Sequence, residues 1–335
     1  MKPYPLLLTP ILKQRVWGGR SLAALGKVLP EETLIGESWE IADLPEEVQD
    51  GRSVIGNGPM AGQTLRQAIT EHPEAILGAA RPTPEGGFPL LIKLLDAREN
   101  LSVQVHPDEA YAARNPGAHV KSEAWVILRA EPGAVIYKGV RPEVTREQFI
   151  GHLETAALVD DLVAVPVAAG DCHYLPSGTC HALGAGIVAA EVQTPSDTTF
   201  RVYDWGRGNR ELHREEALQC IRFGGPGAEP PPLGRPITTA GMRTTPLVQT
   251  EFFEIERIET EAPIRMEVVT SGMPVIWMTL AGSGRIVTKG APAADLGPGT
   301  TALLPAGLAD AVATLEPASS LLRVTLPSPL KGMLA

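Results

Sequence analysis

The sequence predicts a mainly β protein made of two small β-barrels of the same type, with a few added helices. Two observations carry this prediction. The 335 residues include 34 glycines and 31 prolines, which is typical of many short strands joined by turns and excludes a helical bundle. In addition, residues 170–181 (GDCHYLPSGTCH) and residues 299–310 (GTTALLPAGLAD) follow one template.

This internal repeat describes a strand, a tight turn and a return strand. Each copy has Gly, four residues, Leu-Pro-small-Gly, two residues and then a polar side chain, His181 in the first copy and Asp310 in the second. Pro presets φ in such a turn and Gly supplies a permissive backbone. Each copy is followed by another strand-like run, so we expect one barrel around each copy.

The single elements follow from residue patterns. Helices are expected within residues 61–80, 142–162 and 211–223. The first should be interrupted at Pro73, and in the second Thr145 and Gln148 have the spacing of a capping box. Short apolar runs between turns predict strands at 90–95, 101–105, 124–128, 187–192, 252–258, 275–280 and 321–325.

Composition also divides the chain. Residues 224–236 (GGPGAEPPPLGRP) can donate few backbone hydrogen bonds and cannot hold a helix, so they predict a linker. We therefore expect an N-terminal domain at 1–223 with helical insertions, a Pro/Gly linker at 224–240 and a C-terminal β domain at 241–335.

Charge and hydropathy exclude several classes of protein. A net charge of -10 provides no general basic field for nucleic acid. No apolar run approaches the roughly 18 residues of a membrane span. Residues 1–14 are broken by prolines and lack a small-residue cleavage site, so no signal peptide is expected. Cys172, Cys180 and Cys220 form no CxxC motif, which favours a reducing, cytoplasmic setting.

A metal site is predicted in the first barrel. Ser102, Gln104 and His106 alternate with valines, so the period of a strand places them on one face. Glu123 stands at the entry of the next strand, and His181 ends the first copy of the repeat. Two imidazoles and a carboxylate suit a borderline divalent metal such as Zn²⁺ and leave positions open for catalysis. The second copy of the repeat lacks the histidine, so one metal per chain is expected.

Residues 170–181 resemble the second cupin signature, although Ala185 stands where that signature often has Asn. A wider set of motifs resembles the type I mannose-6-phosphate isomerases, especially their short bacterial branch. These motifs are GESWEIAD (36–43), FPLLIKLLDA (88–97), NLSVQVHPDEAYA (100–112), KSEAW (121–125), YLPSGTCHALG (174–184) and SDTTFRVYDWGR (196–207).

The resemblance implies two cupin-type (jelly-roll) barrels, a catalytic N-terminal domain and a C-terminal barrel without metal. It also implies the site: Zn²⁺ held by Gln104, His106, Glu123 and His181, with Arg201 as the active-site arginine and Lys93, Ser102 and Lys121 around the sugar phosphate. For an acidic chain this requires a local basic pocket, so Lys93, Lys121 and Arg201 must lie within reach of one another.

The implied reaction interconverts D-mannose 6-phosphate and D-fructose 6-phosphate through a cis-enediol, moving a proton between C1 and C2. Arg201 would stabilise negative charge. The sequence does not identify the general base. The candidates are a lysine with a lowered pKa, a hydroxide held by the metal, and a carboxylate such as Glu191 or Asp204. The alternatives are a cupin acting on another sugar, free or phosphorylated, an iron dioxygenase, and a sugar-phosphate-binding cupin without catalysis. The expected partner is a small sugar phosphate, with no nucleic acid or membrane.

Overall fold

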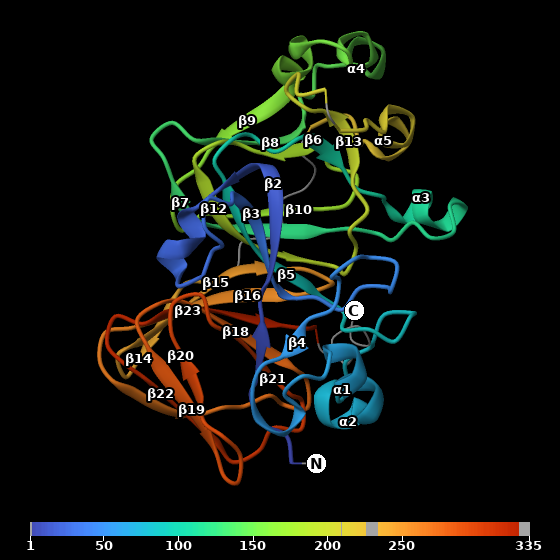
Figure 1. The fold of residues 1–335 in the computed structure, drawn as a ribbon. Helices are drawn as coiled ribbons and strands as arrows, with labels where there is room; N and C mark the ends of the chain where they lie inside the picture. Colours follow the sequence, from blue (N-terminus) through green and yellow to red (C-terminus); the bar gives the residue numbers. More distant parts are fainter. Residues whose placement is uncertain (1, 209, 226–233, 328–335) are drawn as a thin grey trace.

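The computed structural model describes residues 2–208, 210–225 and 234–327, which form two stacked β lobes (Figure 1). The described residues form four sheets, two in each lobe, and their strand pairs are antiparallel. In each lobe a large sheet faces a smaller one across a shared apolar core. The prediction of a mainly β protein with two barrels and a few added helices is confirmed.

The N-terminal barrel is built from a six-stranded and a five-stranded sheet. The six-stranded sheet has the order β10 (Cys172–Leu175), β7 (Glu123–Ala130), β12 (Ile187–Gln193), β5 (Leu91–Ala97), β3 (Ile35–Ile41) and β2 (Ile11–Gly19). The five-stranded sheet has the order β13 (Phe200–Tyr203), β6 (Val103–Val105), β11 (His181–Leu183), β8 (Val135–Val140) and β9 (Leu162–Pro166).

The second barrel is built from an eight-stranded and a four-stranded sheet. The eight-stranded sheet has the order β14 (Ile237–Thr239), β15 (Met242–Gln249), β16 (Glu254–Thr260), β23 (Ser320–Thr325), β18 (Val275–Ala281), β21 (Thr301–Leu304), β1 (Leu6–Thr9) and β4 (Val54–Ile55). The four-stranded sheet has the order β17 (Ile264–Glu267), β22 (Ala311–Leu315), β19 (Gly284–Thr288) and β20 (Ala294–Leu296).

The six-stranded sheet is buried on both faces, which explains the near-continuous apolar runs of its central strands. In β12, Ile187 and Ala189 pack inside the N-terminal barrel, whereas Val188, Ala190 and Val192 pack against the second barrel. Strands β5 and β7 alternate in the same way. Polar side chains on the inner face of these strands therefore point into the barrel.

Both copies of the repeat adopt the predicted strand, turn and return strand. The first copy runs from β10 to β11 and the second from β21 to β22. Each turn carries the chain from the large sheet of its barrel to the small one. Gly170 and Gly299, the first residues of the two copies, have φ of 102° and 75°, which favours glycine. Asp310, the counterpart of His181, is exposed.

The helices lie at the margins of the sheets (Figure 1). Residues 61–80 form α1 (Leu65–Glu71) and α2 (Pro73–Ile76), interrupted at Pro73 as predicted. Residues 142–162 form α4 (Arg146–His152), with the expected capping box of Thr145 and Gln148, followed by a 3-10 helix (Ala156–Asp161).

The third predicted helix is α5 (Arg214–Cys220). The prediction missed α3 (Glu109–Arg114), capped by Asp108, and the 3-10 helices Ser21–Leu25 and Gly58–Met60. No helix in the described part of the chain is long and apolar enough to cross a membrane.

The N-terminal segment contributes strands to the second barrel. Leu6 pairs with Leu303 and Leu8 pairs with Ile55, so β1 and β4 extend the eight-stranded sheet. Residues 226–233 of the predicted 224–240 linker lie outside the described residues. Ile237–Thr239 of the same predicted linker form β14. The sheets thus take strands from both sides of the division expected near 224–240, and that division stays a prediction.

Candidate metal centre and active site

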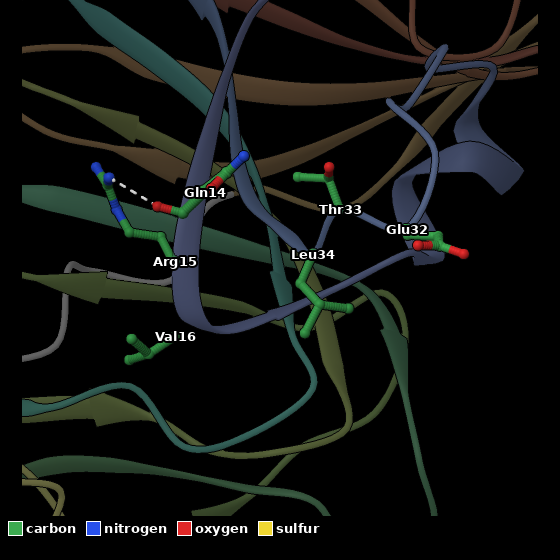
Figure 2. Close-up of a pocket in the computed structure, with 6 residues that line it drawn as sticks. All are labelled: Gln14, Arg15, Val16, Glu32, Thr33 and Leu34. Atoms are coloured by element: carbon green, nitrogen blue, oxygen red, sulfur yellow. Dashed lines mark hydrogen bonds between the residues drawn. The ribbon is translucent and has the colours of Figure 1, made fainter.

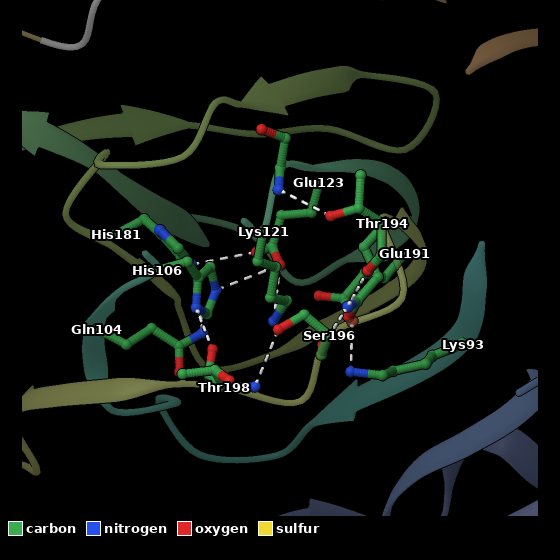
Figure 3. Close-up of polar contacts among 12 residues, drawn as sticks. Lys93, Gln104, His106, Lys121, Glu123, His181, Glu191, Thr194, Ser196 and Thr198 are labelled. Atoms are coloured by element: carbon green, nitrogen blue, oxygen red, sulfur yellow. Dashed lines mark hydrogen bonds and ion pairs between the residues drawn. The ribbon is translucent and has the colours of Figure 1, made fainter. Parts of the chain in front are cut away.

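The candidate site lies between two rows of paired residues that face each other inside the N-terminal barrel. On the six-stranded sheet Glu191 is paired with both Lys93 and Trp125, and the neighbouring Gln193 is paired with Glu123. On the five-stranded sheet Gln104 is paired with both His181 and Arg201. Strand register therefore brings together residues that are far apart in the sequence (Figure 3).

His106, Glu123 and His181 form a buried cluster whose candidate ligand atoms all lie within 4.8 Å of one another. The Nε2 atom of His106 is 3.3 Å from Oε2 of Glu123, and Nε2 of His181 is 3.1 Å from Oε1 of Glu123. The three side chains are at most 2% exposed. The predicted convergence of these three residues is therefore present.

The remaining ring nitrogens of the two histidines define how they can bind a metal. Nδ1 of His106 is 3.1 Å from the carbonyl oxygen of Thr198, and Nδ1 of His181 is 2.8 Å from that of Thr179. A carbonyl oxygen can only accept, so each Nδ1 must donate its proton. A neutral imidazole in this state presents the lone pair of Nε2, and both Nε2 atoms face Glu123.

The charges of the cluster also suit a cation. Burial, followed by the nearby Lys121, lowers the pKa of His106 to about 3. Burial would raise the pKa of Glu123, but the ammonium group of Lys121, the largest opposing cause, holds it well below its usual range. A neutral His106 beside an anionic Glu123 is the combination of protonation states in which these side chains bind metals.

The cluster passes a test of fit for a divalent metal. Nε2 of His106 and both carboxylate oxygens of Glu123 are buried and accept no hydrogen bond from any described residue, although Oε2 of Glu123 is ion-paired with Lys121. Buried polar atoms without hydrogen bonds are costly, and a cation at their centre would satisfy all three. Two histidines and one carboxylate form the protein part of many catalytic zinc sites.

Gln104 lies at the edge of this cluster. Its Nε2 is 3.2 Å from Nε2 of His181. Because the two ends of a carboxamide are exchanged by a half-turn of the group, the same position can present Oε1 to the cluster. Ser102, Gln104 and His106 thus reach the site from one side of the chain, as the alternation with valines predicted.

A pocket of about 320 Å³ opens beside the cluster and contains all the remaining predicted site residues. Lys93, Ser102, Lys121 and Arg201 line it together with Gln104. Nζ of Lys121 lies 3.0 Å from Oε2 of Glu123, which joins the pocket to the cluster. The three cations that the sequence analysis required to lie within reach of one another, Lys93, Lys121 and Arg201, thus line one pocket.

Two of the pocket cations differ in their partners. Nζ of Lys93 is 2.9 Å from Oε2 of Glu191 and 5.4 Å from the centre of the Trp39 ring. Burial would lower the pKa of Lys93, but Glu191 and Glu37 raise it above its usual value. Nη1 of Arg201 donates to the carbonyl of Glu211 at 2.7 Å, whereas its buried Nε has no hydrogen-bond partner among the described residues.

Sequence reasoning missed four charged residues that line the pocket, Arg15, Glu37, Asp197 and Arg210. Nε of Arg15 donates to Oε1 of Glu37 at 2.7 Å. Burial would raise the pKa of Glu37, but Lys93 and Arg15 lower it to about 2. Glu37 and Asp197 lie within two of the motifs that carry the family resemblance, so the motifs contained the signal that strand pattern alone did not give.

A second pocket of about 500 Å³ lies on the outside of β2 and of the segment that precedes β3 (Figure 2). It is lined by Gln14, Arg15, Val16, Glu32, Thr33 and Leu34. The pocket lined by Lys93, Lys121 and Arg201 adjoins the buried His106, Glu123 and His181 cluster through the Lys121–Glu123 contact, so we place the functional site there although that pocket has the smaller volume.

Comparisons with known proteins identify the relatives of this chain. The sequence model of phosphomannose isomerase type I, catalytic domain, matches residues 6–129. The mannose-6-phosphate isomerase of Streptococcus mutans is 37% identical over 289 residues, which cover 84% of this chain and 86% of that protein. A probable mannose-6-phosphate isomerase of Bacillus subtilis is 36% identical over 295 residues, covering 86% of this chain and 89% of that protein.

A solved structure of mannose 6-phosphate isomerase from Bacillus subtilis matches with a TM-score of 0.84 at 30% identity. The match covers 96% of this chain and 99% of the other. Fold and site together define a two-barrel cupin enzyme with a His/Glu/His group that can bind a metal. The chain belongs to the type I phosphomannose isomerase family. The family resemblance and the prediction of an isomerase are thereby confirmed.

Proposed function

We propose that the protein is a zinc-dependent isomerase that interconverts D-mannose 6-phosphate and D-fructose 6-phosphate through a cis-enediol. The observation that carries the proposal is one pocket in which Lys93, Lys121 and Arg201 converge beside a buried His/Glu/His cluster. Relatives that align along most of this chain bear the name mannose-6-phosphate isomerase.

The metal would be held by His106, Glu123 and His181, with Gln104 as a fourth ligand once its amide oxygen faces the cluster. Zn²⁺ suits two imidazole nitrogens, a carboxylate and an amide oxygen. A bound Zn²⁺ would supply Lewis acidity that stabilises negative charge on the sugar oxygens O1 and O2.

The pocket residues would bind and orient the sugar phosphate. Nε of Arg201 has no hydrogen-bond partner among the described residues, and its planar guanidinium suits an anionic oxygen and makes it a poor base. Lys93 remains protonated and Ser102 adds a hydroxyl donor, so both suit the phosphate dianion. Lys121 lines the pocket and also contacts Glu123, so it can interact with both the substrate and this metal ligand.

Transfer of the proton between C1 and C2 requires a base. Lys93 is disfavoured because its pKa is raised rather than lowered. Asp204 is disfavoured because its carboxylate is ion-paired with Arg207 and Arg210, which hold its pKa below the usual value against the opposing effect of burial. Lys121 and Glu191, which both line the pocket, remain the candidates among the side chains considered.

The cation-lined pocket also bears on the alternatives. An iron dioxygenase could use the same two histidines and carboxylate, but its chemistry gives no reason for three convergent cations in the pocket. A phosphorylated sugar does give a reason for these cations, because its phosphate is an anion. Such substrates are found in the cytoplasm, and we propose that the protein acts there.

We also propose that residues 1–223 contain the catalytic machinery and that the 241–335 barrel binds no metal, since Asp310 stands at the position of His181.

The proposal is tested by a coupled assay of mannose 6-phosphate conversion to fructose 6-phosphate, with unphosphorylated mannose as the competing substrate. Wild-type protein should turn over the phosphorylated sugar, and Glu123→Gln, which removes one ligand charge at constant size, should be inactive. Turnover of mannose at an equal kcat/KM would contradict the phosphate pocket. Absence of turnover of either sugar by metal-loaded protein would contradict the isomerase.

A further inference from the structure

The segment Gln193–Thr198, here called the 193–198 loop, begins at the last residue of β12, leads toward β13 and contacts both His106 and the backbone around Lys121. Figure 3 shows Thr194, Ser196 and Thr198 close to His106 and Lys121. Neither the ligand set nor the pocket lining assigns this loop a role, apart from Asp197 in the pocket wall.

One end of the loop orients a metal-ligating histidine. The Thr198 carbonyl accepts the Nδ1 proton of His106 at 3.1 Å. The backbone N–H of Thr198 donates to Oγ of Ser196 at 3.2 Å, and that of Ser196 donates to the Thr194 carbonyl at 2.8 Å. The carbonyl that fixes the tautomer of His106 is therefore held by the fold of the loop itself.

The buried side chain of Gln193 stabilises the loop by hydrogen bonds to its backbone. This side chain is fully buried, and Nε2 donates to the carbonyls of Thr194 at 2.9 Å and Ser196 at 2.7 Å. Two carbonyls of a tight segment are thus bound by one amide group. Loss of these donors would leave both carbonyls without this partner in a buried setting.

The other end of the loop holds the backbone around Lys121. Oγ1 of Thr194 donates to the carbonyl of Val120 at 2.9 Å and accepts from the N–H of Ser122 at 3.2 Å. The N–H of Thr194 donates to the Ser122 carbonyl at 3.1 Å. These hydrogen bonds hold the backbone of Val120 and Ser122, on both sides of Lys121. Nζ of Lys121 lies beside Glu123.

We propose that the 193–198 loop is a positioning element that holds His106 and Lys121 in register with each other. Gln193 is the positioning residue for the metal half, acting through the Thr198 carbonyl. Thr194 is the positioning residue for the Lys121 half. The second part rests on the proposed function, because it takes Lys121 to act on the substrate, whereas the first part concerns the metal alone.

The metal half is tested with Gln193→Met, which keeps the length of the side chain and removes both donors. Zn²⁺ affinity is measured by competition with a chromophoric chelator, and ligand geometry by the visible absorption of the Co²⁺-loaded protein. We expect affinity to fall at least about tenfold, in the range found when partners of metal ligands are removed, with an altered Co²⁺ spectrum.

The matched control is Gln148→Met, which removes the capping box of α4 and leaves the loop intact. It should lower stability while metal affinity and the Co²⁺ spectrum stay at wild-type values. If Gln193→Met does not fold, Ser196→Ala removes the acceptor of the Thr198 N–H and carries the same expectation. Wild-type affinity and spectrum in the folded variant would overturn the proposal for the metal half.

The Lys121 half is tested with Thr194→Val, which is isosteric but lacks the hydroxyl, against Thr194→Ser, which keeps it. We expect Thr194→Val to lower kcat about tenfold, because small displacements of a catalytic group are costly, while Zn²⁺ affinity stays within about threefold of wild type. Thr194→Ser should restore most of kcat. Equal kcat in the two variants would overturn this half.

These readouts separate the two proposals. A wild-type protein that does not turn over mannose 6-phosphate would contradict the proposed function, yet the affinity and spectrum of Gln193→Met would still decide the metal half. An active wild type with an unperturbed Gln193→Met would contradict the positioning role alone.

Discussion

Lys27 and Glu40 form an ion pair that is buried between the two barrels. Nζ of Lys27 is 2.7 Å from Oε2 of Glu40 and donates to the carbonyl of Gly299 at 2.6 Å, while Oγ1 of Thr301 donates to the same Glu40 oxygen at 3.0 Å. Glu40 lies on β3, the strand that also carries Glu37 of the pocket. Gly299 begins the second copy of the repeat, so this copy supports a strand of the N-terminal barrel.

We predict that Lys27→Met destabilises the protein by about 3 to 5 kcal/mol, because it leaves the buried carboxylate of Glu40 without its cation. The measurement is urea unfolding at neutral pH. Arg285→Ala, which breaks the exposed pair with Asp295, should cause no comparable change. Similar unfolding midpoints for both variants would show that the buried pair does not stabilise the contact between the barrels.

Glu37 should contribute stability that depends on pH. Its folded pKa is lowered from 4.5 to about 2, so its contribution is fully present above the unfolded pKa and is lost as pH falls through this window. A shift of this size corresponds to about 3 kcal/mol. Glu37→Gln should therefore lose unfolding free energy less steeply than wild type between pH 5 and pH 3. Parallel profiles would contradict the buried charge interaction.

Arg201→Ala should lower kcat/KM for mannose 6-phosphate about 100-fold, because a charge that stabilises developing negative oxygen is removed. Arg201→Lys keeps the charge but loses the planar fork, so it should recover only part of the activity. Steady-state kinetics measure both. As a control, Arg129→Ala removes an arginine of the same barrel that contacts Ser21 outside the pocket, and it should leave kcat/KM unchanged. Full activity in Arg201→Ala would exclude a catalytic role.

The thiols should be largely unreactive in the folded protein. All three cysteines lie in the described residues and form no disulfide. Burial raises the pKa of Cys220 to about 12 and also raises that of Cys180, so neither forms a thiolate readily. At pH 8 a chromogenic disulfide should label at most Cys172 before unfolding and all three thiols after it. Rapid labelling of three thiols in native protein would contradict the burial of Cys180 and Cys220.

Local patterns in the sequence indicated two parts of the candidate site. The repeat turn located His181, and the alternation around Gln104 located one wall, because both depend on local geometry with period two. The motifs then supplied Lys93, Lys121 and Arg201, which pattern alone could not assign to a pocket.

Other features depend on pairing between distant strands, which local patterns do not encode. β1 has an ordinary apolar sequence, and nothing in it indicates that it joins β21 of the second barrel. The ion pair of Arg15 with Glu37 in the pocket lining joins residues of two different strands, β2 and β3. The short helix α3 has too few residues for a helical period to stand out.

The most direct test of the account measures zinc content and turnover of mannose 6-phosphate on the same samples. Purified protein is stripped with a chelator and then titrated with Zn²⁺, with His181→Ala treated in parallel. The account predicts that activity is lost on stripping, returns in proportion to bound zinc up to one equivalent per chain, and does not return in His181→Ala. Full turnover by protein with no bound metal would contradict it.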